Sequence, residues 1–229
     1  MKNSVLQNAI IKSINEKSVV LQKVIDNTSQ TFIELKVVLR EIVEFYNHQI
    51  QSNDKRIALE LTQKGQFVLE LRVATDVLVF YMHTNTFEFD RSHKIWEQEY
   101  VQNELSKSYC GIINIYNFLN DSFKYNRMDD FGYLIARVFI NKENHFFVEG
   151  KRQRGMGFSN FGKSHIDKTN LRKIVEAAIA YTLEFDLLVP PYESMKVVSI
   201  TQILDEIENT NIQTGKRLGF VYKTDDING

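Results

Sequence analysis

The sequence has little cysteine, little proline and no long hydrophobic run. The single cysteine among 229 residues, Cys110, cannot form a disulfide within the chain, which favours a reducing compartment and an inert, buried thiol. The only two prolines are Pro190 and Pro191, so there is no proline-rich linker. The longest central apolar run, Val77–Met82, is far shorter than the roughly 20 residues that cross a bilayer. The N-terminus also lacks the apolar core of a secretory signal, so we predict a cytoplasmic protein with no membrane partner.

Neither sign of charge dominates the composition. The chain has 28 Lys+Arg against 29 Asp+Glu, a formal net charge of −1. This balance excludes a polycationic nucleic-acid coat and an acidic tail protein, but it leaves room for a local basic site. Hydrophobic residues at 43% and charged residues at 25% are typical of globular proteins and exclude a disordered or fibrous chain. The length fits one large domain or two small ones.

Residues 4–50 show helical periodicity in two segments. In the second segment, from Phe32 to Tyr46, apolar residues recur at steps of three and four. The first segment is less regular, and Asn27–Ser29 between the two offers a turn and an N-cap. We therefore predict an N-terminal helical hairpin, with a domain boundary after residue 52. Its apolar stripe requires a partner, which is either the rest of the fold, a second copy in a homodimer or another protein.

After the hairpin, apolar and polar residues alternate with the period of β-strands. The turn sequences Lys64-Gly65 and Asn141–Asn144 lie between paired runs, so we expect two β-hairpins there. Residues 53–229 are thus predicted to form an α+β domain, an antiparallel sheet packed with helices. The expected strands are 57–61, 67–73, 77–82, 112–118, 133–140, 145–150, 195–200 and 218–222, and the expected helices are 92–106, 170–188 and 201–208.

The segment Lys151–Lys173 concentrates positive charge. It holds seven Lys or Arg residues, one acid (Asp167) and three of the ten glycines, and it leads into a predicted helix. Glycines let backbone N–H groups approach an anion, and a helix start presents unpaired donors. The glycine spacing matches neither the P-loop nor the dinucleotide fingerprint, so NTP hydrolysis is unsupported. The segment is either a solvated basic loop or an anion site; in the second case the ligand-binding residues are Lys151, Arg152, Arg154, Gly155, Gly157, Lys163, Arg172 and Lys173.

Glu149 and Lys151 resemble the catalytic half-motif of the PD-(D/E)xK nucleases. In that family two acids hold a divalent metal and the lysine assists the attacking water, so the resemblance implies Mg²⁺ or Mn²⁺. A hairpin loop at Asn141–Asn144 sets Glu149 opposite Ala136, which leaves the upstream acid Asp130 about 20 Å away, too far to share a metal. The five histidines show no metal-ligand spacing either, so no other cofactor is expected.

Two further features admit both a structural and a functional interpretation. Arg137 and Glu149 are charged residues within mainly apolar strands, so they are held either by an internal salt bridge with a basic residue from the surface or as polar anchors of a small-molecule pocket. The predicted register sets them on opposite faces of the hairpin. A run of asparagine and tyrosine either lines a pocket or caps turns; its members are Asn114, Tyr116, Asn117, Asn120, Tyr125 and Asn126.

The order of elements is similar to that of small intracellular sensor domains of the PAS and GAF type, by analogy of element order alone. Together with the basic segment, it favours a non-enzymatic cytosolic binding or sensor module for an anionic ligand. A nucleotide, a phosphorylated metabolite and nucleic acid all fit that description. Two alternatives stay open: a metal-dependent nuclease that uses Glu149 and Lys151, and an interaction or adaptor protein that docks through its N-terminal helices.

Overall fold

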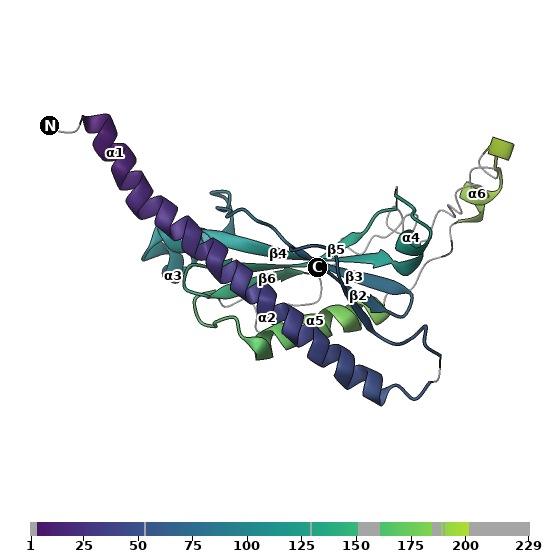
Figure 1. The fold of residues 1–229 in the computed structure, drawn as a ribbon. Coiled ribbons are helices and arrows are strands. Elements are labelled where there is room, and N and C mark those ends of the chain that lie inside the picture. Colours follow the sequence, from purple (N-terminus) through teal and green to yellow (C-terminus); the bar gives the residue numbers. More distant parts are fainter. Residues whose placement is uncertain are drawn as a thin grey trace.

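The computed structural model describes residues 4–52, 54–128, 130–150, 161–184, 189 and 191–201 of the chain. Within them, a long helix precedes six strands and a second packed helix (Figure 1). Among these residues, no helix is both long enough and apolar enough to cross a membrane. The helical elements are α1 (Val5–Ser13), η1 (Ile14–Ser18), α2 (Val19–Gln49), η2 (Lys94–Glu97), α3 (Glu99–Gln102), η3 (Leu105–Ser108), α4 (Asn120–Lys124), α5 (Lys168–Leu183) and α6 (Tyr192–Met195), and the strands are β1 (Glu60–Gln63), β2 (Val68–Val73), β3 (Asp76–Met82), β4 (Cys110–Leu119), β5 (Tyr133–Asn141) and β6 (Phe146–Gly150).

The N-terminal region is one continuous helix and not the predicted hairpin. α1, the π-helical turn η1 and α2 follow one another without a break over residues 5–49. The polar run predicted as a turn lies inside α2, where the Thr28 hydroxyl donates to the Val24 carbonyl at 2.7 Å and Thr31 donates to Asn27 at 2.8 Å. These bonds satisfy the hydroxyls on the helix's own backbone, so the residues do not end the helix. The wider turn of η1 absorbs the irregular apolar spacing of the first segment.

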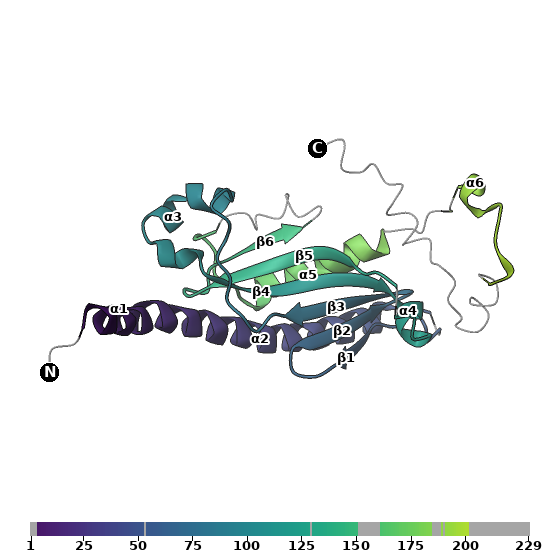
Figure 2. The same ribbon diagram turned by 90° about the horizontal axis from the view of Figure 1, so that it is seen from above.

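The six strands form one antiparallel sheet in the order β1-β2-β3-β4-β5-β6, so each strand pairs with its neighbour in the chain (Figure 2). This confirms the predicted α+β class, and both predicted hairpins are present. The β1–β2 turn contains Gly65 at a φ of +81°, a conformation that glycine adopts without strain. The β5–β6 turn contains Asn144 at a φ of +59°, which asparagine tolerates better than most residues.

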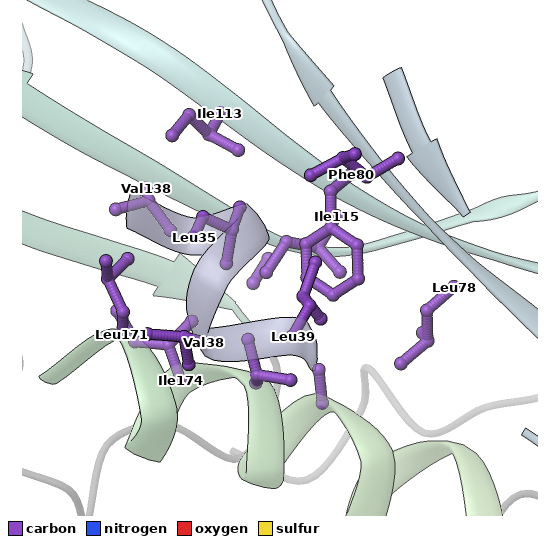
Figure 3. Packing of buried hydrophobic residues seen from close by; sticks show 14 of the residues in the cluster. Leu35, Val38, Leu39, Leu78, Phe80, Ile113, Ile115, Val138, Leu171 and Ile174 are labelled. Atoms are coloured by element: carbon purple, nitrogen blue, oxygen red, sulfur yellow. The ribbon is translucent and has the colours of Figure 1, made fainter. Parts of the chain in front are cut away.

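The main core lies between one face of the sheet and the two long helices. The buried stripe of α2 and the inner face of α5 pack together on this face, so the fold itself covers the C-terminal part of the long helix. α5 is confirmed as a helix, and Asp167 caps its first turn. Figure 3 shows the centre of the core, to which α2 contributes Leu35, Val38 and Leu39, the sheet contributes Leu78, Phe80, Ile113, Ile115 and Val138, and α5 contributes Leu171 and Ile174.

A smaller cluster covers the opposite face at the β4–β6 end. The segment predicted as one helix over 92–106 forms three short turns, η2, α3 and η3, because its apolar residues do not share a helical stripe. Ile95 and Val101 are six residues apart, which is about 240° around an α-helix, yet both side chains are buried on the sheet. Cys110 lies in this cluster, and burial raises the pKa of its thiol, as expected for an inert cysteine.

The predicted strand 195–200 is wrong. Met195 ends the short helix α6, and the residues after it lie in no strand. Val197, Val198 and Ile200 are 81%, 51% and 79% exposed, so no sheet edge among the described residues pairs with this segment. Apart from Thr201, the predicted helix 201–208 lies outside the described residues, as do the predicted strand 218–222 and the last part of the predicted helix 170–188.

Candidate ligand-binding face

The structure describes three of the eight predicted anion-binding residues. Lys151, Arg152, Arg154, Gly155 and Gly157 lie outside the described residues, whereas Lys163 and Lys173 are exposed and Arg172 is partly buried.

A side chain of the protein itself caps the N-terminus of α5. The Asp167 carboxylate accepts a 2.7 Å hydrogen bond from the Asn170 backbone N–H, which occupies one of the donors expected to meet an anion. The Arg172 guanidinium donates to Glu176 at 2.9 Å and lies 5.2 Å from the ring centre of Phe45 on α2. It thus belongs to the helical side of the molecule.

Both described ends of the basic segment meet the outer edge of the sheet. β6 ends at Gly150, which pairs with Ala136 of β5. The chain returns at Phe161, whose ring centre lies 5.0 Å from that of Phe147 on β6 and 5.3 Å from that of Tyr100. Gly150 and Phe161 therefore both lie on the β6 side of the sheet, where the smaller cluster lies.

The register of the β5–β6 hairpin differs by one residue from the prediction. Glu149 pairs with Arg137 and not with Ala136. The reason is the turn: the Asn141 N–H donates to the His145 carbonyl at 3.0 Å, which leaves three loop residues with Asn144 in the left-handed conformation. An odd loop length shifts every pair by one, so Arg137 and Glu149 lie side by side on one face.

Glu149 joins two other side chains in a polar group. Its Oε2 accepts a 2.6 Å hydrogen bond from Arg137, and its Oε1 lies 3.2 Å from the Nε2 of His93. The His93 Nδ1 accepts from the Ile95 backbone N–H at 3.1 Å, which assigns the ring proton to the nitrogen that faces Glu149. The two charges, which the predicted register placed on opposite faces, thus form an ion pair with each other, and their side chains remain 44% and 33% exposed. Arg137 is thus held in place while it stays open to solvent.

A cross-strand row extends from this pair over the sheet. Successive strands bring Val68, Tyr81, Asn114, Arg137 and Glu149 directly opposite one another. The row lies on the face opposite α2 and α5, beyond the edge of the smaller cluster. Tyr81 is 37% exposed and Asn114 is partly exposed, so the described residues leave this row accessible. We name Tyr81, Asn114 and Arg137 the polar row.

The predicted asparagine–tyrosine run serves two purposes. Asn114 and Tyr116 lie on the open face, whereas Asn117 is buried with 1% of its surface exposed. Asn120 begins α4, and Asn126 takes a φ of +51° just after that helix. The first part of the run therefore contributes to the open face, and the later part shapes a turn.

A second polar group, which the sequence did not reveal, surrounds Tyr100. Its hydroxyl donates to Glu143 at 2.6 Å and accepts from the Asn141 side chain at 2.8 Å. The Nδ1 of His145 also lies 2.8 Å from this hydroxyl, and the ring of His165 lies 4.1 Å from that of His145. Burial and Glu143 raise the pKa of Tyr100, whereas burial and the neighbouring His165 lower the pKa of His145. Tyr100 and His165 come from segments distant from the β5–β6 turn that supplies the other three residues, so no local pattern marked the group.

The described carboxylates do not assemble a metal site. Within the described residues, no group of three His, Cys, Asp or Glu side chains is placed to hold an ion. Both oxygens of Glu149 are engaged, and Asp130 forms an ion pair with Arg127 at 3.1 Å and accepts a hydrogen bond from the Ser122 hydroxyl at 2.6 Å. No observation therefore favours the metal-dependent nuclease.

Comparison of the chain with protein-family models, curated proteins and solved structures finds no match. The fold is that of an α+β protein, and the described residues leave the polar row on one sheet face exposed to solvent. The similarity to PAS and GAF domains in element order stays an analogy.

Proposed function

We propose that the chain is a non-enzymatic module that binds an anionic ligand of the nucleotide class on its open sheet face. The observation that supports this proposal is the polar row, in which an exposed tyrosine, an amide and a positioned guanidinium lie directly opposite one another. The three side chains stem from adjacent strands about 4.8 Å apart, so they cover a span of roughly 10 Å.

Arg137 is the anchor of the proposed site. Glu149 accepts a hydrogen bond from one of its terminal nitrogens, and a guanidinium has further N–H donors in a planar fork that suits phosphate or carboxylate oxygens. His93 holds the other oxygen of Glu149, so the carboxylate is itself oriented. A guanidinium that is held in advance loses less conformational entropy when an anion binds.

The remaining members of the row suit the uncharged part of such a ligand. The exposed ring of Tyr81 offers a face on which a base can stack, and the Asn114 amide has both donors and acceptors for ring edges. The basic residues Lys151, Arg152 and Arg154 follow β6 directly in the sequence, and their positive charge suits an anionic ligand. This combination supports a nucleotide or a short stretch of single-stranded nucleic acid over a simple inorganic anion.

Calorimetric titration of the full chain at low salt tests the proposal, with AMP, ADP, an oligonucleotide and inorganic phosphate as probes. We expect a nucleotide or the oligonucleotide to bind, and Arg137→Gln to weaken it roughly 10- to 100-fold, as the loss of a charged hydrogen bond does. Arg137→Lys keeps the charge but loses the fork, so it should give an intermediate affinity. Arg40→Gln is the matched control, because Arg40 is exposed on α2, across the sheet. No binding by any probe, or equal losses in Arg137→Gln and Arg40→Gln, contradicts the proposal.

The contribution of the basic segment is tested separately. Reversing the charges of Arg152 and Arg154 to Glu should weaken binding of the oligonucleotide and reduce its salt dependence, because fewer counterions are released. Reversal of Lys23 and Arg40 to Glu, both exposed on α2, is the charge-matched control. Unchanged affinity and salt dependence in the variant of Arg152 and Arg154 would restrict the site to the polar row.

A further inference from the structure

The first part of the long helix extends beyond the sheet. In Figures 1 and 2, α1 projects past the strands, and the packed part of the helix begins further along the chain. No side chain from Val5 to Val19 is buried, whereas Val24 and later residues of the stripe are. A capping box between Ser4 and Gln7 nevertheless fixes the helix start, with hydrogen bonds of 2.7 and 3.2 Å. The chain thus specifies a helix whose apolar side chains the described residues leave exposed.

This projecting helix carries an apolar stripe. Leu6, Ile10 and Ile14 follow one another at intervals of four, and they are 69%, 50% and 56% exposed. Ile11 flanks the stripe at 46% exposure. A helix of about 15 residues is marginal alone in water, and its stability comes from packing of such a face. The stripe therefore requires a partner.

We propose that the partner is a second copy of the chain, with the two projecting helices packed antiparallel about a two-fold axis at Ile10. Leu6 and Ile14 lie at equal distances on either side of Ile10. A two-fold axis there sets Ile10 against its own counterpart and Leu6 of each copy against Ile14 of the other. The stripe is thus complementary to itself, which is what an isologous contact requires. Ile11 of both copies meets on the same flank of the contact.

The charge distribution of the projecting helix favours a second copy of the chain over a membrane as the partner. The projecting segment has three charged residues, Lys12, Glu16 and Lys17, so it is close to neutral, and it has no aromatic residue. A helix that lies on an anionic bilayer carries many Lys and Arg on its polar face and Trp or Phe on the other. Lys12 is two residues from Ile10, about 200° around the helix, so it points away from the contact. Antiparallel packing also sets the two helix dipoles in opposition.

The proposed contact between the two helices is small compared with the interfaces of stable complexes. Paired from about residue 4 to residue 16, the helices share a strip roughly 20 Å long and 10 Å wide. This is smaller than the about 800 Å² per partner of a standard stable complex. We therefore expect a dimer that dissociates on dilution, and not a permanent one.

Sedimentation velocity of the full chain over a concentration series tests the dimer. We expect reversible association that Ile10→Lys abolishes, since it sets two like charges face to face. Asn8→Lys adds the same charge about 160° around the helix from Ile10 and should leave association intact. An equimolar mixture of Ile10→Lys and Ile10→Glu should restore it. Position 10 is exposed, so circular dichroism and thermal unfolding of these variants should match the wild type. A monomer at every concentration, or a mixture that stays monomeric, overturns the proposal.

The direction of packing has its own test. Leu6→Cys mixed with Ile14→Cys should form a disulfide-linked heterodimer under mild oxidation, and either variant alone should form little. The native Cys110 is fully buried and does not compete. A parallel pair instead links each variant to itself, and that pattern overturns the antiparallel arrangement. Sedimentation of monomeric chain with vesicles of anionic lipid would assign the stripe to a membrane and also overturn the proposal.

Discussion

Thr28 of α2 lies directly over Gly111 of β4. A Cβ atom added at position 111 would lie 2.0 Å from the Thr28 Oγ1 and 2.8 Å from its Cβ. The absence of a side chain at Gly111 thus lets the helix cross the sheet at close range. The same hydroxyl donates to the Val24 carbonyl, so it is fixed in place and cannot swing away without losing that bond.

Gly111→Ala should destabilise the fold, because the added methyl group cannot be accommodated without moving helix and strand apart. We expect a loss of about 1–3 kcal/mol in the free energy of unfolding, the usual range for an overpacked core. Urea denaturation measures it. The variant Thr28→Ala removes two of the three clashing atoms, so the double variant should recover part of the loss. Strictly additive effects of the two substitutions would mean that the contact does not constrain the packing.

Tyr100→Phe should also destabilise the fold. It removes the hydroxyl that joins Glu143, Asn141 and His145, and leaves three partly buried polar groups without their common partner. The expected loss is about 1–3 kcal/mol in the free energy of unfolding. Tyr116→Phe is the matched control, because that tyrosine lies on the open sheet face and its hydroxyl bonds to no described residue. Equal effects of the two substitutions would contradict the importance of the group around Tyr100.

Stability should depend on pH through His145. Burial and the adjacent His165 lower the pKa of His145 in the folded state below the ordinary value of 6.5. Between these two values the unfolded chain binds more protons, so the free energy of unfolding rises with pH. The contribution of His145 is complete above about pH 6.5 and is lost as the pH falls toward the folded-state pKa.

Chemical denaturation of wild type and His145→Gln at pH 5–7 measures this dependence. The stability of the wild type relative to the variant should increase with pH over that window. Parallel curves for the two proteins would show that His145 does not titrate differently on folding.

The hairpins could be predicted from local sequence patterns because hairpin formation depends on residues that are close together in the sequence. Alternating apolar residues and the turn chemistry of Gly65 depend on residues near in sequence, and the strand positions followed. The hairpin register required one more fact, that Asn144 takes a left-handed conformation. That single residue decides whether Arg137 faces Glu149, and hence whether the two charges form a pair or separate on two faces.

The predictions from sequence were wrong where contacts between distant segments determine the local structure. The polar run at Asn27–Ser29 has the composition of a turn, yet the Asn27 side chain donates to the Asn141 carbonyl at 3.0 Å and Thr28 packs on Gly111. Those partners are more than 80 residues away in sequence, so periodicity gave no sign of them. For the candidate site, Arg137, Glu149 and Asn114 stood out as polar residues within apolar strands. Tyr81 did not, because a tyrosine that alternates in a strand resembles a core residue until the covered face is known.

The simple order of the sheet has a consequence for the newly made protein. Because each strand pairs with its neighbour in the chain, each pairing becomes possible once the second strand has left the ribosome. α2 is made before all of them, and its buried stripe, which ends at Ile42, packs on strands as late as β5. At roughly 5–20 residues per second, the approximately 90 residues that separate Ile42 from β5 take about 5–20 s to synthesise. During that interval the part of the apolar stripe that packs on β5 in the finished fold has no strand to cover it.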